Sequence, residues 1–292
     1  MSRALQSNIA IRTTAIIAVI AATVYFVQKL RKANDLHVRG VQAQHGKVHV
    51  NPALKLRPED VSTAISNAPR AVPRVVHVTY KNKSIVPDKV WRQYDKYAKG
   101  YNIKFYDDEQ CRRYLRDHFP PHVLQRYLTI KSGAHRADMF RYAVLYREGG
   151  VYLDVKTILL RPLDEIIGLT SNIAVLSREP PDTVYQGIIV AAPLDTRFLH
   201  LLDMAIATPD ELLEINYFIF VGQYYVTVQE ALHVHHLVPT DDVPGWRIFA
   251  EVCDRTTVNG ICNQLDRYGF CCYIVDSKGQ MMFKTRYPDF PW

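Results

Sequence analysis

The chain has 292 residues and a mass of 33.6 kDa, with 48% hydrophobic and 22% charged residues. This composition is typical of a globular protein and excludes disordered, collagenous and coiled-coil chains. The net charge of +7 is uneven: residues 1–60 contain nine Lys and Arg against three Asp and Glu, whereas residues 61–292 contain 27 against 26. A nucleic-acid-binding protein clusters basic residues on its folded face, so we expect no nucleic-acid partner here.

Residues 1–32 are expected to form an N-terminal signal anchor. The sixteen residues between Arg12 and Lys29 carry no charge, and residues 7–28 together approach the length of a membrane-spanning helix. A cleaved signal peptide and a buried core helix are the alternatives. The apolar run continues beyond the small residues and has no polar face, which favours the anchor. Basic residues on both sides leave its topology open.

Residues 33–70 are polar and contain several glycines and prolines without a sustained period. Such a segment is typical of a stem between a membrane anchor and a folded body. The alternative is an N-terminal extension that packs on the body. The body itself is expected over residues 71–292.

The body begins with alternating strand and helix patterns. A β-branched strand is expected at 74–80, a helix from Pro87 to Gly100, a strand at 102–106 and a helix at 109–118. This order predicts an α/β fold with a mostly parallel central sheet. Ligands of such sheets bind at the carboxyl ends of strands. The candidates at those ends are Tyr80, Asp107 and Asp108.

Residues 131–157 carry the strongest pattern. Ser132 is a suitable N-cap for a helix at 134–147, and Gly149-Gly150 would end it. A short apolar strand at 151–155 then places Asp154 near its end. Asp138 and Arg141 are three residues apart and therefore share a helical face. An ordinary ion pair within the helix is the alternative explanation of that spacing.

These segments resemble the family 32 glycosyltransferases, which have a DXD sugar-binding region and include the yeast Golgi initiating α-1,6-mannosyltransferases and the inositol-phosphoceramide mannosyltransferases. The resemblance covers about residues 72–165. The matching residues are Pro73 to Tyr80, Pro87, Trp91, Ala137-Asp138, Arg141-Tyr142, Leu145 and Gly149 to Asp154. Residues 186–193 are similar to the strand that follows the DXD region in this family.

The resemblance implies a GT-A-like fold and a transferase that moves a hexose, mannose or similar, from a nucleotide sugar to a glycan or lipid acceptor, with retention. The implied donor is GDP-mannose or a UDP-hexose. The implied location is a membrane of the Golgi or another secretory compartment. By the same resemblance, the catalytic residues are Asp138, Arg141 and Asp154, and the donor-binding residues are His77, Tyr80, Tyr152, Lys156 and Gln186.

One position departs from the family motif, because Asp154-Val155-Lys156 has a lysine where DXD has its second carboxylate. The family implies Mn²⁺ or Mg²⁺ bound by Asp154. If a metal binds, His233 or His235 is a candidate third ligand, because alternating residues of a strand share a face; surface or hydrogen-bonded core histidines are the alternative. A protonated lysine cannot bind a cation and repels one. Three interpretations follow: a metal held by other ligands, Lys156 in place of the metal, or a non-catalytic protein that binds nucleotide sugars or glycans.

Four cysteines lie within twenty residues near the C-terminus: Cys253, Cys262, Cys271 and Cys272. Their spacing fits no zinc-binding pattern. In a secretory lumen, one or two disulfides are expected among them, whereas in the cytosol they would be buried thiols.

Overall fold

The computed structural model describes residues 52, 54–60, 72–256, 265 and 269–285. All of them belong to one compact unit, Val48–Trp292. The expected anchor at residues 1–32 and most of the expected stem lie outside the described residues. Among the helices that the structure does describe, none combines the length and apolarity needed to cross a membrane.

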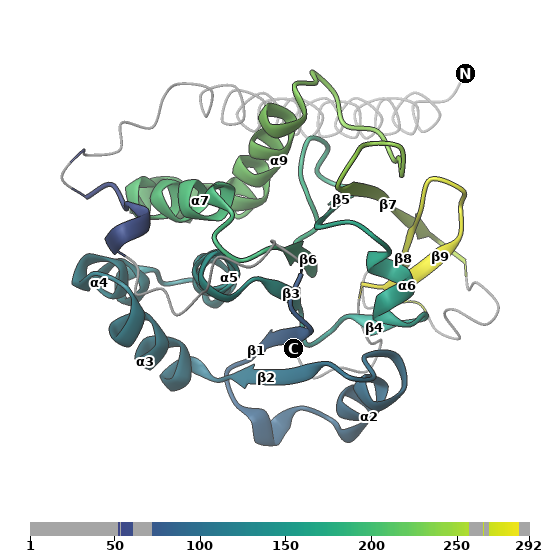
Figure 1. Ribbon diagram of the computed structural model, residues 1–292, viewed down its shortest axis with the longest axis horizontal. Helices are drawn as coiled ribbons and strands as arrows, with labels where there is room; N and C mark the ends of the chain where they lie inside the picture. Colours follow the sequence, from purple (N-terminus) through teal and green to yellow (C-terminus); the bar gives the residue numbers. More distant parts are fainter. Residues whose placement is uncertain (1–51, 53, 61–71, 257–264, 266–268, 286–292) are drawn as a thin grey trace, which may run out of the picture. The chain divides into compact units, whose positions relative to one another are not determined.

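A nine-stranded sheet forms the centre of the described unit, in the order β2-β1-β3-β6-β5-β7-β8-β9-β4 (Figure 1). The strands are β1 Val75–Thr79, β2 Asn102–Tyr106, β3 Gly150–Leu153, β4 Ile158–Leu159, β5 Asn172–Leu176, β6 Ile188–Ala191, β7 Trp246–Asp254, β8 Cys271–Val275 and β9 Met281–Lys284.

The strands are not mostly parallel, as the sequence predicted. Strand β1 is parallel to β2 and β3, and β5 is parallel to β7. The other five neighbouring pairs in the described sheet are antiparallel. The strands up to β3 alternate with helices and pair in parallel. Most later strands run antiparallel to their neighbours, with β5 and β7 as the exception. The fold is therefore α/β with a mixed sheet.

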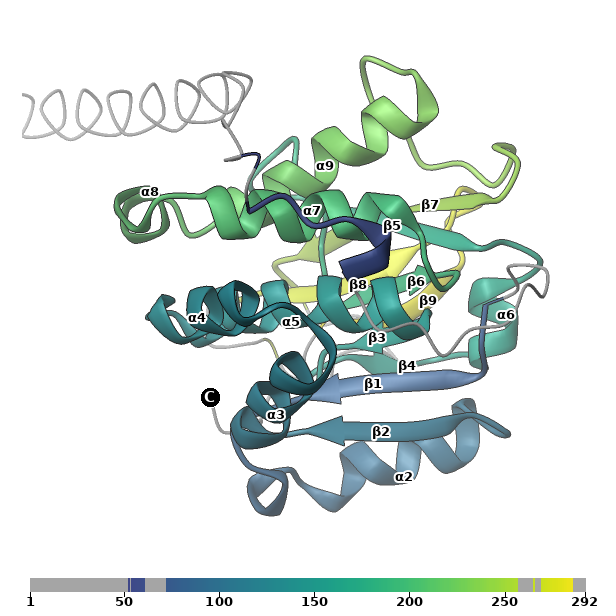
Figure 2. The same cartoon turned by 60° about the vertical axis from the view of Figure 1, so that its left-hand side comes forward.

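Helices cover both faces of the sheet (Figure 2). Apolar side chains of α2 (Asp88–Tyr97) and α6 (Leu163–Ile167) pack on one face. The other face packs against α3 Asp108–His118, α4 Pro121–Thr129, α5 Gly133–Glu148, α7 Thr196–Ala207 and α9 Ile219–Leu232. The remaining described elements are α8 Asp210–Ile215 and the 3-10 turns η1 Pro58–Asp60 and η2 Lys83–Ile85.

Strand β3 shows why the central strands are apolar throughout. Val151 and Leu153 point into the core under α2 and α6, whereas Tyr152 points into the core under α5. All four residues of the strand are buried. A strand covered by helices on both faces reads as a continuous apolar run, because neither face meets water.

The elements predicted between residues 74 and 155 are confirmed within one to three residues, and α4 and the 3-10 turn η2 are the elements of this range that were not predicted. The Ser132 hydroxyl caps α5 by accepting from the backbone N–H of His135, at 3.4 Å. Gly149 ends that helix with a φ of +63°. The α2 helix ends before Gly100, which has a φ of +78°. Local sequence signals therefore define this half of the fold.

A residue of the predicted stem packs on the folded body. Leu56 is 2% exposed and belongs to the core on the α5 side of the sheet. Its backbone N–H donates to Asp203 of α7, at 2.9 Å. The chain at Leu56 therefore packs on the domain.

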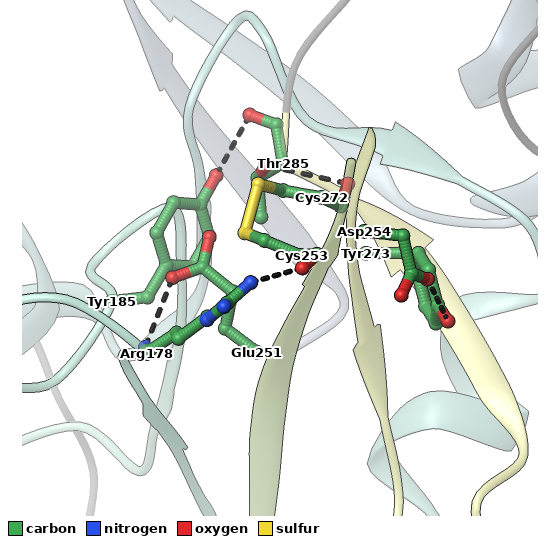
Figure 3. Close-up of a disulfide and its surroundings, with 8 residues drawn as sticks. All are labelled: Arg178, Tyr185, Glu251, Cys253, Asp254, Cys272, Tyr273 and Thr285. Carbon is green, nitrogen blue, oxygen red and sulfur yellow. Dashed lines mark hydrogen bonds between the residues drawn. A yellow bond between two sulfur atoms is a disulfide. The ribbon is translucent and has the colours of Figure 1, made fainter. Parts of the chain in front are cut away.

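A disulfide joins two neighbouring C-terminal strands (Figure 3). Cys253 on β7 and Cys272 on β8 are directly paired in the antiparallel ladder, and their sulfur atoms are bonded. Nearby, the Tyr185 hydroxyl donates to the Thr285 carbonyl, at 3.1 Å. The expected disulfide is confirmed, and it holds the C-terminal strands to the rest of the sheet.

Candidate functional site

Two glycines position the junction between α5 and β3. Gly149 and Gly150 have φ values of +63° and +93°. A Cβ on Gly149 would lie 2.5 Å from the Pro193 backbone nitrogen, and one on Gly150 would lie 2.5 Å from Val75 Cγ1. Only glycine fits these two positions without displacing backbone. The close approach sets β3 between β1 and β6, so that the end of β3 faces α5.

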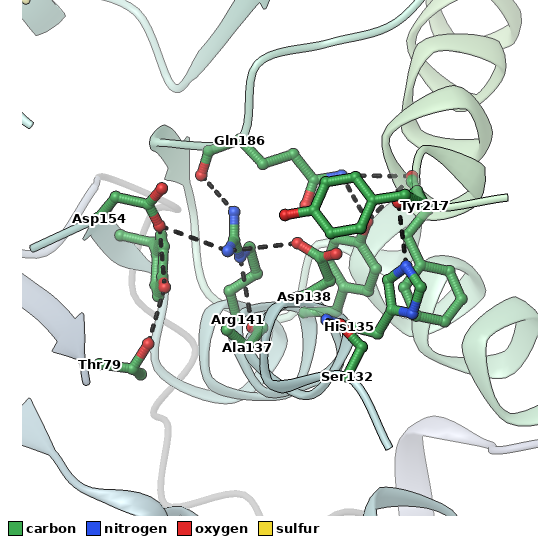
Figure 4. A network of polar contacts seen from close by, with 12 residues as sticks. Thr79, Ser132, His135, Ala137, Asp138, Arg141, Asp154, Gln186 and Tyr217 are labelled. Carbon is green, nitrogen blue, oxygen red and sulfur yellow. Dashed lines mark hydrogen bonds and ion pairs between the residues drawn. The ribbon is translucent and has the colours of Figure 1, made fainter. Parts of the chain in front are cut away.

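Arg141 is the centre of a buried charge cluster at the carboxyl end of β3 (Figure 4). Its Nη2 atom lies 3.2 Å from Asp138 Oδ1 and 3.4 Å from Asp154 Oδ1. Its Nη1 atom donates to the Gln186 backbone carbonyl. Only 6% of the Arg141 side chain is exposed, and its guanidinium stacks 4.4 Å from the centre of the Tyr152 ring. Arg141 therefore fixes both carboxylates relative to each other.

Burial changes the acidity of the clustered groups. It raises the pKa of Asp138, and the nearby Arg141 offsets this only in part. Burial by itself would lower the pKa of Arg141. The electrostatic interactions with Tyr152, Asp138 and Asp154 outweigh this effect, and the pKa of Arg141 is raised overall. The pKa of Tyr152 is raised, mainly by burial. Arg141 is thus permanently charged, and its charge opposes the rise that burial causes in the pKa of Asp138.

Asp154 lies at the rim of the cluster, just after β3. The Tyr152 hydroxyl donates to Asp154 Oδ1, at 3.3 Å, and lies 2.8 Å from the Thr79 hydroxyl of β1. Lys156 Nζ lies 3.5 Å from the other carboxylate oxygen, Oδ2. The side chains of Asp154 and Lys156 are 18% and 31% exposed, so a ligand can reach them.

Most of the predicted site residues therefore lie together, but Gln186 contributes differently than expected. Its backbone carbonyl contacts Arg141. Its side-chain amide is buried, and donates to the Tyr142 hydroxyl at 2.6 Å and to the Phe220 carbonyl at 3.2 Å. Gln186 thus joins the cluster to the start of α9.

His77 lies away from this cluster. It is fully buried, with Nε2 3.0 Å from the Gly149 carbonyl and Nδ1 3.2 Å from the Tyr106 hydroxyl. Burial lowers the pKa of His77 to about 4. The structure therefore places this predicted donor-binding residue in the core, as a neutral side chain that braces the α5–β3 junction. Tyr80 follows β1 at its carboxyl end and is half-buried; burial raises its pKa.

The predicted third metal ligands do not lie near Asp154. His233 and His235 follow the last turn of α9, with His233 as its C-cap, and both are exposed and outside any strand. The opposite end of this 14-residue helix contacts the cluster through Phe220. At about 1.5 Å per residue, the helix separates the two ends by roughly 20 Å. The predicted strand with both histidines on one face is therefore wrong.

Asp107 and Asp108 have structural roles. The Asp107 side chain accepts from the Gln110 backbone N–H at 2.8 Å and completes a capping box at the start of α3. Asp108 Oδ2 lies 3.6 Å from Arg136. These contacts account for two carboxylates that a parallel strand end had suggested as site residues.

Sequence reasoning missed two hydroxyl groups that support the cluster. The Thr79 hydroxyl is hydrogen-bonded to the Tyr152 hydroxyl, and the Tyr142 hydroxyl accepts a hydrogen bond from the Gln186 side-chain amide. Thr79 lies at the end of a predicted strand, which was a usable signal. Tyr142 follows Arg141 in the matched motif, but the sequence alone could not show that its ring is fully buried.

The arrangement around Asp154 does not fit a divalent cation. Among the described residues, the only three His, Cys, Asp or Glu side chains close enough to share an ion are Glu251, Cys253 and Cys272, two of which form the disulfide. A metal about 2.1 Å from Asp154 Oδ2 would lie at most about 5.6 Å from the Lys156 ammonium, because Nζ is 3.5 Å from that oxygen. At an effective dielectric constant of about 20, that repulsion amounts to at least roughly 6 kcal/mol.

Comparison with known proteins gives a family match over part of this chain. Residues 58–172 match the family described as glycosyltransferase sugar-binding region containing DXD motif. This segment contains Asp138, Arg141 and Asp154, so the buried charge cluster belongs to the matched region.

Several curated proteins match parts of the chain. An uncharacterized glycosyltransferase of Acanthamoeba polyphaga mimivirus is 28% identical over 34% of this chain and 41% of its own length. Inositol phosphoceramide mannosyltransferase 3 of Schizosaccharomyces pombe is 32% identical over 35% of this chain and 29% of its own length. The initiation-specific alpha-1,6-mannosyltransferase of Candida albicans is 26% identical over 50% of this chain and 42% of its own length. The matches thus span less than half the length of these relatives.

A solved structure, PaToxG glycosyltransferase, aligns with 72% of this chain and 90% of its own chain at 13% identity, with a TM-score of 0.35. Residues 58–172 are thus similar to the glycosyltransferase family with a DXD-containing sugar-binding region, and parts of the chain are distantly similar to yeast mannosyltransferases.

Proposed function

We propose that this protein is a glycosyltransferase that moves a hexose from a nucleotide sugar to a glycan or lipid acceptor. The observation that carries the proposal is the Arg141 cluster, which holds Asp138 and Asp154 together at the carboxyl end of β3. Carboxylates fixed beside a guanidinium suit the recognition of sugar hydroxyls and of a phosphate-bearing donor. The yeast relatives named as mannosyltransferases support mannose as the hexose and GDP-mannose as the donor.

The transfer we propose retains the anomeric configuration. The bond between the anomeric carbon and the diphosphate oxygen breaks, and its electron pair stays on that oxygen. The acceptor hydroxyl oxygen bonds to the same carbon from the same face, and its proton passes to the departing diphosphate. Both Asp138 and Asp154 are ion-paired with Arg141, which lowers their nucleophilicity and favours this route over a covalent intermediate.

Each residue of the cluster would have a role that follows from its position. Asp138, deep in the cluster, would orient hexose hydroxyls. Arg141 would keep that carboxylate ionised and fixed in place. Asp154 and Lys156, at the exposed rim, would face the sugar and the diphosphate. The Tyr152–Thr79 hydrogen bond would keep Asp154 oriented without a contact to substrate.

A membrane-bound location in a secretory compartment is part of the proposal. Residues 7–28 would anchor the protein, and the Cys253–Cys272 disulfide supports an oxidising environment for the folded domain.

The test uses the full chain with radiolabelled GDP- and UDP-hexoses and mixed glycan and glycolipid acceptors. We expect transfer from one donor, and a loss of about 100-fold or more in kcat for Asp154→Asn. The matched control is Asp164→Asn, which changes an exposed carboxylate paired with Arg74 and should leave transfer unchanged. Turnover that is equal in both variants would refute the assigned site.

A second candidate is a non-catalytic protein that binds nucleotide sugars or glycans. Lys156, in place of the second DXD carboxylate, is the observation that favours it. Donor binding without transfer to any acceptor would support this candidate over the enzyme.

A further inference from the structure

We propose that the Lys156 ammonium takes the position of the divalent cation and binds the donor diphosphate, so that the site works without a metal. This inference rests on the proposed function, because it concerns the donor of that same reaction. It gives a role to the residue at which the sequence departs from the DXD motif. The backbone around Lys156, the neighbouring charges and the exposure of its side chain all support this role.

The backbone around Lys156 is held rigidly. The Thr157 N–H donates to the Asp154 carbonyl at 2.8 Å, which makes a tight turn with Val155 and Lys156 at its centre. The Gly187 carbonyl accepts from both ends of that turn, from the Asp154 N–H and the Thr157 hydroxyl, each at 2.9 Å. The position of the Lys156 Cα is therefore fixed relative to Asp154. Contact with a ligand therefore needs no rearrangement of the backbone at Lys156.

The two oxygens of Asp154 each face a different cation. Arg141 contacts Oδ1 from the buried side, and Lys156 contacts Oδ2 from the exposed side. The Arg141 side chain is 6% exposed and the Lys156 side chain is 31% exposed. An incoming anion therefore reaches the ammonium of Lys156, whereas Arg141 stays committed to the two carboxylates.

The charges of the cluster favour an exchange of partners. Asp138 and Asp154 carry two negative charges, and Arg141 and Lys156 carry two positive ones. When the diphosphate binds, the ammonium can turn from Asp154 to a phosphate oxygen, while Arg141 keeps its contact with Asp154 and the two carboxylates share that one cation. A metal would instead have to displace or oppose the ammonium.

The ammonium also suits the reaction step. The leaving diphosphate gains negative charge as its bond to the anomeric carbon breaks, and a hydrogen bond from an ammonium to that oxygen strengthens as the charge grows. Lys156 makes and breaks no covalent bond in this step, and the acceptor's proton still passes to the diphosphate. Its ammonium does the electrostatic part of what a metal does in a two-carboxylate site.

The experiment measures binding of UDP and GDP to the full chain by isothermal titration, first in EDTA and then with Mn²⁺. For the wild type, we expect binding in EDTA and less than about a twofold gain from Mn²⁺. For Lys156→Met, affinity in EDTA should fall by about tenfold or more, because a charge-assisted hydrogen bond is lost. Lys156→Asp should lose binding in EDTA and regain it with Mn²⁺, because it restores the second carboxylate.

The matched control is Lys278→Met, which removes an exposed lysine in the turn between β8 and β9 and should leave nucleotide affinity unchanged. Thermal unfolding of each variant checks that the fold is retained. Binding by the wild type only when Mn²⁺ is present, or equal binding by Lys156→Met and the wild type, would overturn the role of Lys156 while leaving the transferase intact. If neither UDP nor GDP binds the wild type under any condition, the proposed function fails as well.

Discussion

Replacing Arg141 with methionine should destabilise the domain more than any surface charge change. The substitution keeps much of the apolar volume but leaves the Asp138 carboxylate buried without its cation; the Arg141 and Asp138 side chains are only 6% and 11% exposed. Removing one partner of a buried ion pair costs about 3–5 kcal/mol. In a domain of this size, such a loss lowers the melting temperature by roughly 6–20 °C.

The pH dependence of Arg141→Met gives a more specific signature than its melting temperature. Burial already raises the pKa of Asp138, and loss of Arg141, which opposes that shift, raises it further. An acid with a raised folded pKa penalises folding only when it ionises. The variant should therefore approach wild-type stability near pH 4, around the unfolded pKa of an aspartate, and lose stability as pH rises through the folded pKa.

The assay is chemical unfolding of the full chain at several pH values, with the variant compared with the wild type at each pH so that common groups cancel. The double variant Asp138→Asn with Arg141→Met removes both charges and should recover part of the lost stability without the pH dependence. Arg74→Met, which breaks an exposed ion pair with Asp164, is the control and should change stability little. A pH-independent loss in Arg141→Met, or no loss, would refute the reasoning about the buried pair.

Three further predictions concern the stability of the fold. Because burial lowers the pKa of His77 to about 4, while an unfolded histidine titrates near 6.5, stability should fall as pH decreases from about 6.5 to 4, by up to roughly 3 kcal/mol. His77→Gln should remove that part of the pH dependence in urea unfolding, and an unchanged profile would contradict the buried neutral histidine. Gly150→Ala should lower the free energy of unfolding by more than about 2 kcal/mol, because its Cβ would lie 2.7 Å from the Val75 carbonyl oxygen at a positive φ; wild-type melting would show that β1 can move. Breaking the Cys253–Cys272 disulfide by a double serine variant opens a loop with a sequence separation of 19 and should cost about 3 kcal/mol in thermal unfolding. A melting temperature unchanged by the double variant would contradict a stabilising role.

The sequence predicted the first half of the fold well because its signals are local. The helical spacing at 88–97, the cap at Ser132 and the glycines at 149 and 150 each act within a few residues. The antiparallel half was missed for the opposite reason. The direction in which β7, β8 and β9 pair depends on contacts between distant segments, which apolar periodicity does not encode.

The site was predicted in composition but not in geometry. The motif brought Asp138, Arg141 and Asp154 together, yet the spacing of Asp138 and Arg141 alone would fit an ordinary ion pair within one helix. The contact from Arg141 to Asp154 requires β3 to return beside α5, which only the fold shows.

Single side chains were harder to place than the motif. His77 and Thr79 lie on the same strand, but of these two only Thr79 contacts the cluster. The His77 ring is hydrogen-bonded to the Gly149 carbonyl instead. In a strand covered on both faces, an apolar run does not show which side chain meets a ligand. The histidines after α9 were misplaced because a helix end was read as a strand.

The most direct test of the account is a crystal structure of the protein with a donor analogue bound. We predict the hexose beside Asp138 and Arg141, and the diphosphate within hydrogen-bond distance of Lys156. The structure also has a separate cavity of about 420 Å³ beside β2 and α3, lined in part by Lys104 and Glu148. A nucleotide sugar bound in that cavity, with the Arg141 cluster left untouched, would contradict the central claim.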